Sequence, residues 1–129
     1  MRAIDTNVLV RFLVADDKRQ AEQARAAFEA GDITIATTVM LESEWVLGSA
    51  YGFAPGQIAA ALRKLAGLPG VALEEPALMA QALDQMAAGM DFADALHLGK
   101  AGHCDSFLTF DRKLIKAAGK QSSISVREP

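Results

Sequence analysis

The first fourteen residues place a carboxylate between a short strand and a helix. Residues 2–4 are too few for anything but a strand, and Asp5 follows directly at its carboxyl end. The apolar residues at positions 8, 9, 12 and 13 then share one face of a helix. A strand, a turn and a helix open a βαβ unit. Because ligands of open α/β sheets bind beyond the carboxyl ends of the strands, we expect Asp5 to lie in such a crevice.

The rest of the chain alternates between short strands and longer helices. Apolar and β-branched segments predict further strands at residues 33–36, 71–73, 106–109 and 123–126. Amphipathic patterns predict two helices in each of the first three intervals between strands and one helix in the last interval. This alternation favours a parallel sheet that is covered by helices on both faces.

Short polar side chains mark where two of these helices begin. Asp17 is expected to cap the second helix, with Gln20 three residues later as its capping-box partner. Thr37 or Thr38 is expected to cap the third helix, which runs to about Ala50.

Composition and charge limit the class of protein. The chain has 129 residues, which suits one domain over residues 1–129, and 51% of them are apolar. The net charge of −3 argues against a cationic nucleic-acid clamp, although a bound divalent metal can reverse the local charge. Cys104 is the single cysteine, which fits a reducing, cytoplasmic setting. We expect no signal peptide, because Asp5 and Asn7 interrupt any apolar run at the start of the chain. We expect no membrane-spanning segment either, since no apolar run approaches about 20 residues.

Four carboxylates occupy similar positions relative to the predicted elements. Asp5 and Asp111 each follow a strand, and Glu42 lies in the first turns of the helix after the second strand. These three can meet, because strand ends and the helix starts after them share one edge of a right-handed βαβ sheet. Asp94 lies in the first turn of the helix before the fourth strand, and it joins the other three acids only if that helix enters from the same side.

Each acid also has an ordinary structural explanation. Asp91 and Asp94 have the spacing of a helix cap and its third residue, and Asp111 could be another cap. Glu42 and Glu44 could both be solvated. Clustered carboxylates, however, repel one another unless a cation lies among them. A set of oxygen ligands favours Mg²⁺ or Mn²⁺ over zinc.

Four segments, in order along the chain, resemble a known family. Residues 4–9 (IDTNVL) look like the opening motif of PIN-domain proteins, above all the VapC-like toxin ribonucleases. Residues 41–47 (LESEWVL) resemble the segment that carries the second acid of that family, residues 91–97 (DFADALH) the third, and residues 108–111 (LTFD) the fourth. Together they span essentially the whole chain.

The resemblance implies a set of catalytic, metal-binding acids: Asp5, Glu42, Asp94 and Asp111. It also implies two supporting polar residues, Asn7 and Thr109. The implied fold is a small three-layer α/β/α sandwich around a mostly parallel sheet of four to five strands. The implied activity is Mg²⁺- or Mn²⁺-dependent cleavage of RNA by a homodimeric toxin that a small antitoxin protein inhibits.

Some assignments stay open between alternatives. Glu44 is the reserve for Glu42, because a helix turns the two side chains about 200° apart and only one can face the site. Asp91 is either a fifth acid or a cap. Three basic residues could steer RNA phosphates or be solvated helix residues: Arg11, Arg112 and Lys113.

Two other functions fit part of the pattern. A haloacid-dehalogenase-like Mg²⁺ phosphatase also has Asp after its first strand. That family requires a second Asp two residues later, where this chain has Asn7. A PIN-like domain that binds RNA or a protein without cutting is the other alternative, and four intact acids argue against it. No zinc-protease or serine-hydrolase signature is present in the sequence.

Overall fold

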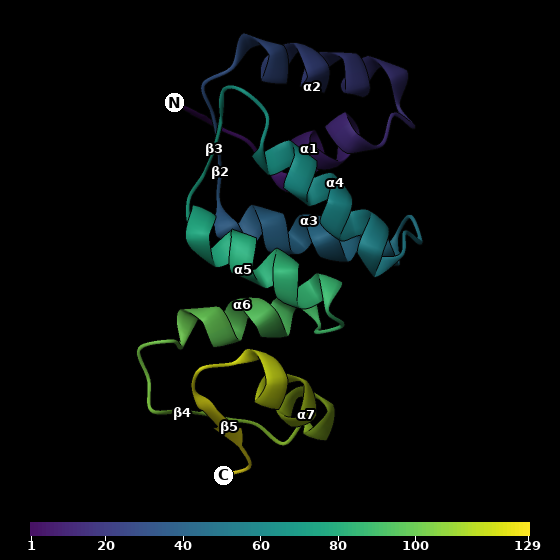
Figure 1. The fold of residues 1–129 in the computed structure, drawn as a ribbon. Helices are drawn as coiled ribbons and strands as arrows, with labels where there is room; N and C mark the ends of the chain where they lie inside the picture. Colours follow the sequence, from purple (N-terminus) through teal and green to yellow (C-terminus); the bar gives the residue numbers. More distant parts are fainter. The chain divides into compact units, whose positions relative to one another are not determined.

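A computed structural model describes residues 1–119 and 121–129 in full (Figure 1). Contacts divide the chain into two compact units, Met1–Pro76 and Ala77–Pro129. The chain length predicts a single domain. That prediction depends on how the two units combine, and it stays a prediction.

The first unit, which is described throughout, contains three strands and four helices. In chain order these are β1 (Arg2–Ala3), α1 (Thr6–Leu13), α2 (Lys18–Ala30), β2 (Ile33–Ile35), α3 (Thr37–Ser49), α4 (Pro55–Ala66) and β3 (Val71–Leu73). The strands form one parallel sheet in the order β1-β2-β3, with Arg2 opposite Ile33 and Ile33 opposite Val71. The strands and helices predicted for this part of the chain are all present.

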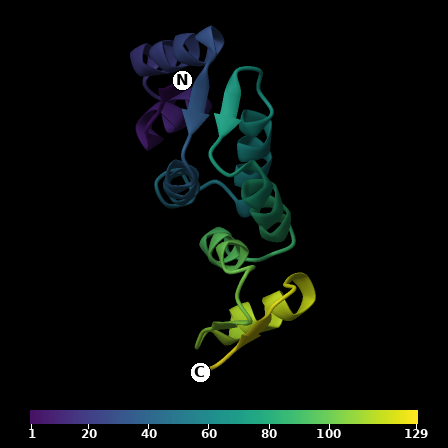
Figure 2. The same cartoon turned by 90° about the vertical axis from the view of Figure 1, so that its left-hand side faces the viewer.

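Helix packing holds the sheet and α1 in place. α1 packs against both α2 and α3, and α3 packs against α4, which lies along β3. Figure 2 shows β2 and β3 side by side, with α4 next to β3. The buried apolar side chains of this unit include Leu9, Val10, Phe28, Ile33, Ile35, Met40, Leu47 and Leu62. Burial of each large side chain of this kind contributes about 1.5–3 kcal/mol, so the start of α1 rests on a well-packed core.

The predicted cap of α2 is present without its predicted partner. The Asp17 side chain accepts a hydrogen bond from the backbone N–H of Gln20 at 3.0 Å. The Gln20 side chain does not complete a capping box, because its Oε1 accepts a hydrogen bond from Arg11 Nε at 2.7 Å.

The start of α3 differs from the predicted one. The residue at the N-cap is Ala36, so Thr37 is already helical and the prediction of a threonine cap was wrong. Oε1 of Glu74, which follows β3, instead accepts a hydrogen bond from the backbone N–H of Thr37 at 3.0 Å. The acceptor lies 37 residues away in the sequence, so no local pattern could reveal it.

The second unit contains the remaining elements. These are α5 (Pro76–Ala87), which begins at the last residue of the first unit, then α6 (Phe92–Lys100), β4 (Ser106–Leu108), α7 (Arg112–Gln121) and β5 (Ser125–Arg127). β4 and β5 pair in parallel, with Phe107 opposite Val126, and α7 packs against β5.

The strands are those predicted, but their pairing is not. We expected one sheet of four to five strands, whereas the described strands form a three-stranded sheet, β1-β2-β3, and a two-stranded one, β4-β5. Sequence patterns identify a strand but not its partner, and strands this short carry few side chains that could specify one. The mixed α/β class with parallel strands is confirmed, the size of the sheet is corrected, and the three-layer sandwich stays a prediction.

None of the described helices has the length and apolar character needed to cross a membrane.

Candidate active site

Asp5 lies between β1 and α1 and is fixed by the start of the helix. As the N-cap residue, it accepts a hydrogen bond on Oδ1 from the backbone N–H of Val8 at 3.0 Å. Its Oδ2 has no hydrogen-bond partner among the described residues, and the side chain is exposed. One oxygen therefore sets the orientation of the carboxylate, while the other remains available to a ligand.

Glu42 lies in the same cavity as Asp5. The Thr6 hydroxyl donates a hydrogen bond to Oε1 of Glu42, which links the first turn of α1 to α3. Asp5, Asn7 and Glu42 are among the residues that line this cavity of about 390 Å³, which we call the acid cavity. Glu44 is half-buried and does not line it.

Arg11 borders the acid cavity and is held by three polar side chains. Its Nε donates to Gln20, and its Nη1 donates to Asp16 at 2.8 Å and to the Tyr51 hydroxyl at 3.0 Å. Tyr51 in turn donates to the other oxygen of Asp16 at 2.9 Å. This hydrogen bond lowers the pKa of Asp16, and the charge of Arg11 lowers it further against an opposing effect of desolvation. Nη2 of Arg11 has no partner among the described residues.

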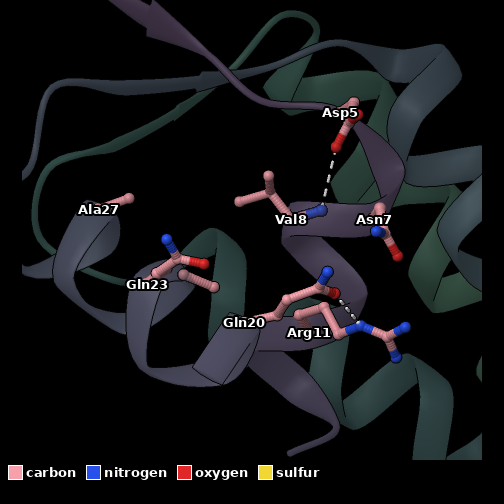
Figure 3. Close-up of a pocket in the computed structure, with 8 residues that line it drawn as sticks. Asp5, Asn7, Val8, Arg11, Gln20, Gln23 and Ala27 are labelled. Atoms are coloured by element: carbon pink, nitrogen blue, oxygen red, sulfur yellow. Dashed lines mark hydrogen bonds between the residues drawn. The ribbon is translucent and has the colours of Figure 1, made fainter. Parts of the chain in front are cut away.

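A second cavity opens on the other side of Asp5 (Figure 3). It has a volume of about 300 Å³ and lies between α1 and α2, and we call it the amide cavity. Asp5, Asn7 and Arg11 line both cavities. Gln20 and Gln23 of α2 line only this one.

The second unit holds three of the expected acids. Asp91 is the N-cap of α6 and accepts a hydrogen bond from the backbone N–H of Asp94 at 3.1 Å. Asp111 is the N-cap of α7 and accepts from the backbone N–H of Leu114 at 3.1 Å. The Thr109 hydroxyl accepts a hydrogen bond from the backbone N–H of Asp111 at 3.0 Å, which supports the turn that carries this acid.

These acids are close enough to affect one another. Burial of the half-buried Asp94 carboxyl raises its pKa, and the negative charges of Asp91 and Asp111 raise it further. His97 has a smaller, opposite effect on the pKa of Asp94. Asp94 therefore lies within electrostatic reach of Asp91 and Asp111.

The other basic residues predicted near the site are exposed. Arg112 lies 3.6 Å from a carboxylate oxygen of Glu128 and is almost fully solvent-accessible, so this ion pair contributes little to stability. Lys113 is exposed as well.

The donor set fits a hard divalent ion. Asp5 and Glu42 in the first unit, and Asp94 and Asp111 in the second, offer only carboxylate oxygens, which Mg²⁺ and Mn²⁺ prefer. Within either unit, the described residues form no group of three or more His, Cys, Asp or Glu side chains positioned to hold a metal.

Three residues of this arrangement were not predicted. Thr6 lies inside the motif of residues 4–9, and its hydroxyl was the available signal. Asp16 and Tyr51 lie 35 residues apart, and no spacing rule joins them to Arg11.

The fold and these residues define a mixed α/β protein in which Asp5, Asp91 and Asp111 cap helix starts and Glu42 shares a cavity with Asp5. The PIN domain family model matches residues 3–120, and the chain therefore belongs to the PIN domain family. No curated protein and no solved structure matched the chain in the same comparisons.

Membership of this family carries a general function. PIN domains are generally nucleases, so a nuclease-type, hydrolytic activity on nucleic acid is assigned to this chain at that level. PIN domains also typically use divalent metal ions.

Proposed function

We propose that this PIN domain is a Mg²⁺- or Mn²⁺-dependent endoribonuclease that acts in the cytoplasm as the toxin of a toxin–antitoxin pair. The observation that carries the proposal is the family match over residues 3–120, within which all four expected acids are intact.

Four carboxylates would hold the metal: Asp5, Glu42, Asp94 and Asp111. Asp5 and Glu42 line one cavity of the first unit. In the second unit, the negative charge of Asp111 raises the pKa of Asp94. A divalent ion bound by such acids supplies Lewis-acid chemistry for phosphodiester hydrolysis. Glu44 remains the reserve for Glu42, and Asp91 remains the candidate for a fifth acid.

The other site residues would position these acids and the RNA. Thr6 holds the Glu42 carboxylate through its hydroxyl, and Thr109 supports the turn at Asp111. Asn7 lines the cavity beside Asp5 and offers an amide to the sugar–phosphate backbone. Arg11 has Nη2 open and is already oriented by Gln20, so it can bind a phosphate without losing much side-chain entropy. The exposed Arg112 and Lys113 would attract the RNA at longer range.

Cleavage assays test the enzyme. Incubation of the protein with single-stranded RNA and Mn²⁺ should cut the RNA, and EDTA should stop the cutting. Para-nitrophenyl phosphate should remain intact, since its hydrolysis would favour a phosphatase. RNA binding without cutting would favour a silent PIN-like domain.

A pair of matched variants tests the site. Asp5→Asn and Asp17→Asn each keep a good N-cap, because Asn caps a helix about as well as Asp. We expect Asp5→Asn to lose more than the 10–100-fold that even supporting residues of a metal site typically cost. Asp17→Asn should cleave like the unmodified chain. Full activity of Asp5→Asn would refute the assignment.

The toxin role has its own test. Expression of the unmodified chain should arrest growth, expression of Asp5→Asn should not, and co-expression of a small protein encoded next to the gene should restore growth. Light scattering on the purified chain would test the proposed homodimer.

A further inference from the structure

The amide cavity differs in chemistry from the acid cavity. Its one carboxylate is Asp5, at the border that the two cavities share. Its other polar groups on α2 are the side-chain amides of Gln20 and Gln23, and the small residues Ala24 and Ala27 form an apolar wall on the same helix. Asp5 and Arg11, the charged residues of the lining, lie at the border with the acid cavity, and the α2 side of the amide cavity is uncharged. This side suits an uncharged polar ligand rather than a second metal ion.

The side-chain amides of Gln20 and Gln23 differ in their hydrogen bonds. Oε1 of Gln20 already accepts a hydrogen bond from Arg11, so this side chain presents its N–H donors to a ligand. Gln23 is exposed, and neither its oxygen nor its nitrogen has a partner among the described residues. Figure 3 shows both side chains pointing from α2 toward α1. Gln23 can therefore donate and accept at the same time.

We infer that the amide cavity binds the nucleobase next to the phosphate that is cleaved at Asp5, and that Gln23 determines which base is preferred. The inference rests on the proposed ribonuclease function. A base is flat, uncharged and rimmed with donors and acceptors, and a glutamine amide can match two of them in one plane. The volume of about 300 Å³ lies at the lower end of roughly 300–1,000 Å³, the range typical of ligand pockets.

Arg11 connects the base to the phosphate. It lines both cavities, and Gln20 holds its guanidinium from the side of the amide cavity. A base in the amide cavity and a phosphate in the acid cavity would lie on either side of Arg11, as neighbouring groups of one nucleotide. The amide cavity therefore extends the proposed site along the strand.

A binding experiment without metal tests this inference independently of cleavage. NMR spectra of the ¹⁵N-labelled full chain in EDTA would be recorded with four short single-stranded RNAs, each of one base. We expect the side-chain amide signals of Gln20 and Gln23 to shift, and one RNA to bind more tightly than the others. Gln23→Ala should reduce this discrimination by roughly 5- to 100-fold. The matched control Gln81→Ala, an exposed glutamine of α5, should leave it unchanged.

Cleavage of a randomised RNA supplies the second readout. The unmodified chain should prefer one base beside the cut, and Gln23→Ala should flatten that preference while the cutting still needs metal. Unchanged discrimination in Gln23→Ala, or RNA-induced shifts that avoid Gln20 and Gln23, would overturn the inference. A chain that shows the binding effect but never cuts RNA would support the base subsite and contradict the nuclease.

Discussion

Gly70 is the residue whose replacement should most directly test how the first unit is assembled. Its backbone has φ +78°, and a Cβ added there would lie 2.8 Å from the Cα of Gly31 and 3.4 Å from the backbone N of Asp32. The carbonyl of Gly70 also accepts a hydrogen bond from the backbone N–H of Ile33 at 2.8 Å. The close approach therefore sits where β2 and β3 begin to pair.

The cost of Gly70→Ala follows from two effects. The left-handed backbone costs an L-residue about 1–2 kcal/mol. The new methyl would meet backbone atoms that no side-chain rotation can clear, and overpacking of this kind typically costs about 1–3 kcal/mol. Alanine also restricts the unfolded chain, which returns about 0.4–1 kcal/mol. We expect the free energy of unfolding to fall by about 2–4 kcal/mol.

Gly52→Ala is the matched control. Gly52 has a similar φ of +71°, but a Cβ there would meet nothing within 4 Å. The free energy of unfolding of Gly52→Ala should therefore fall by about 1 kcal/mol or less, from the backbone effect alone. Urea unfolding followed by far-UV circular dichroism would measure both variants. Equal losses in the two would show that the contact with Gly31 contributes nothing and would refute the reasoning.

Three further predictions concern single side chains. Ser43 is fully buried with no partner for its hydroxyl among the described residues, so Ser43→Ala should raise the free energy of unfolding by about 1 kcal/mol, whereas destabilisation would reveal a missed partner. The pKa of Asp16 is lowered in the folded chain, so the contribution of this carboxylate to stability is present at neutral pH and is lost as the pH falls through the lowered pKa. The difference in unfolding free energy between the unmodified chain and Tyr51→Phe should therefore shrink on acidification. A constant difference would contradict the assignment. Thr6→Val should weaken Mn²⁺ binding about 10-fold or more in titration calorimetry, because it removes the hydroxyl that holds Glu42, while Thr6→Ser should restore it.

Features that depend on neighbouring residues could be predicted from the sequence. The caps at Asp17 and Asp111 each bind a backbone N–H three residues later, so the pattern that reveals them is contained in one turn. The cap at Asp5 has the same spacing but was not predicted. The signals for strand positions are equally local. The order of elements and the candidate acids of the site follow from these signals.

Features that depend on distant residues could not be predicted. Glu74 takes the place of a threonine cap at Thr37, and Tyr51 reaches Arg11 from a turn 40 residues away. The division of the strands into two sheets could not be predicted either. The sequence of a very short strand shows where the strand lies in the chain, but it does not specify which other strand it pairs with. The amide cavity also lay outside the prediction, since it arises where α1 and α2 pack.

The caps bear on how such acids should be interpreted. A carboxylate at a helix start has an ordinary structural role, and Asp5 and Asp111 both fulfil it. That role occupies one oxygen, Oδ1 in each case, and it fixes the side chain in a single orientation. A metal ligand needs the remaining oxygen, the negative charge and the same fixed orientation. Because Asn preserves the cap but removes the charge, stability reports the first role and metal affinity the second, and one substitution separates them at either residue.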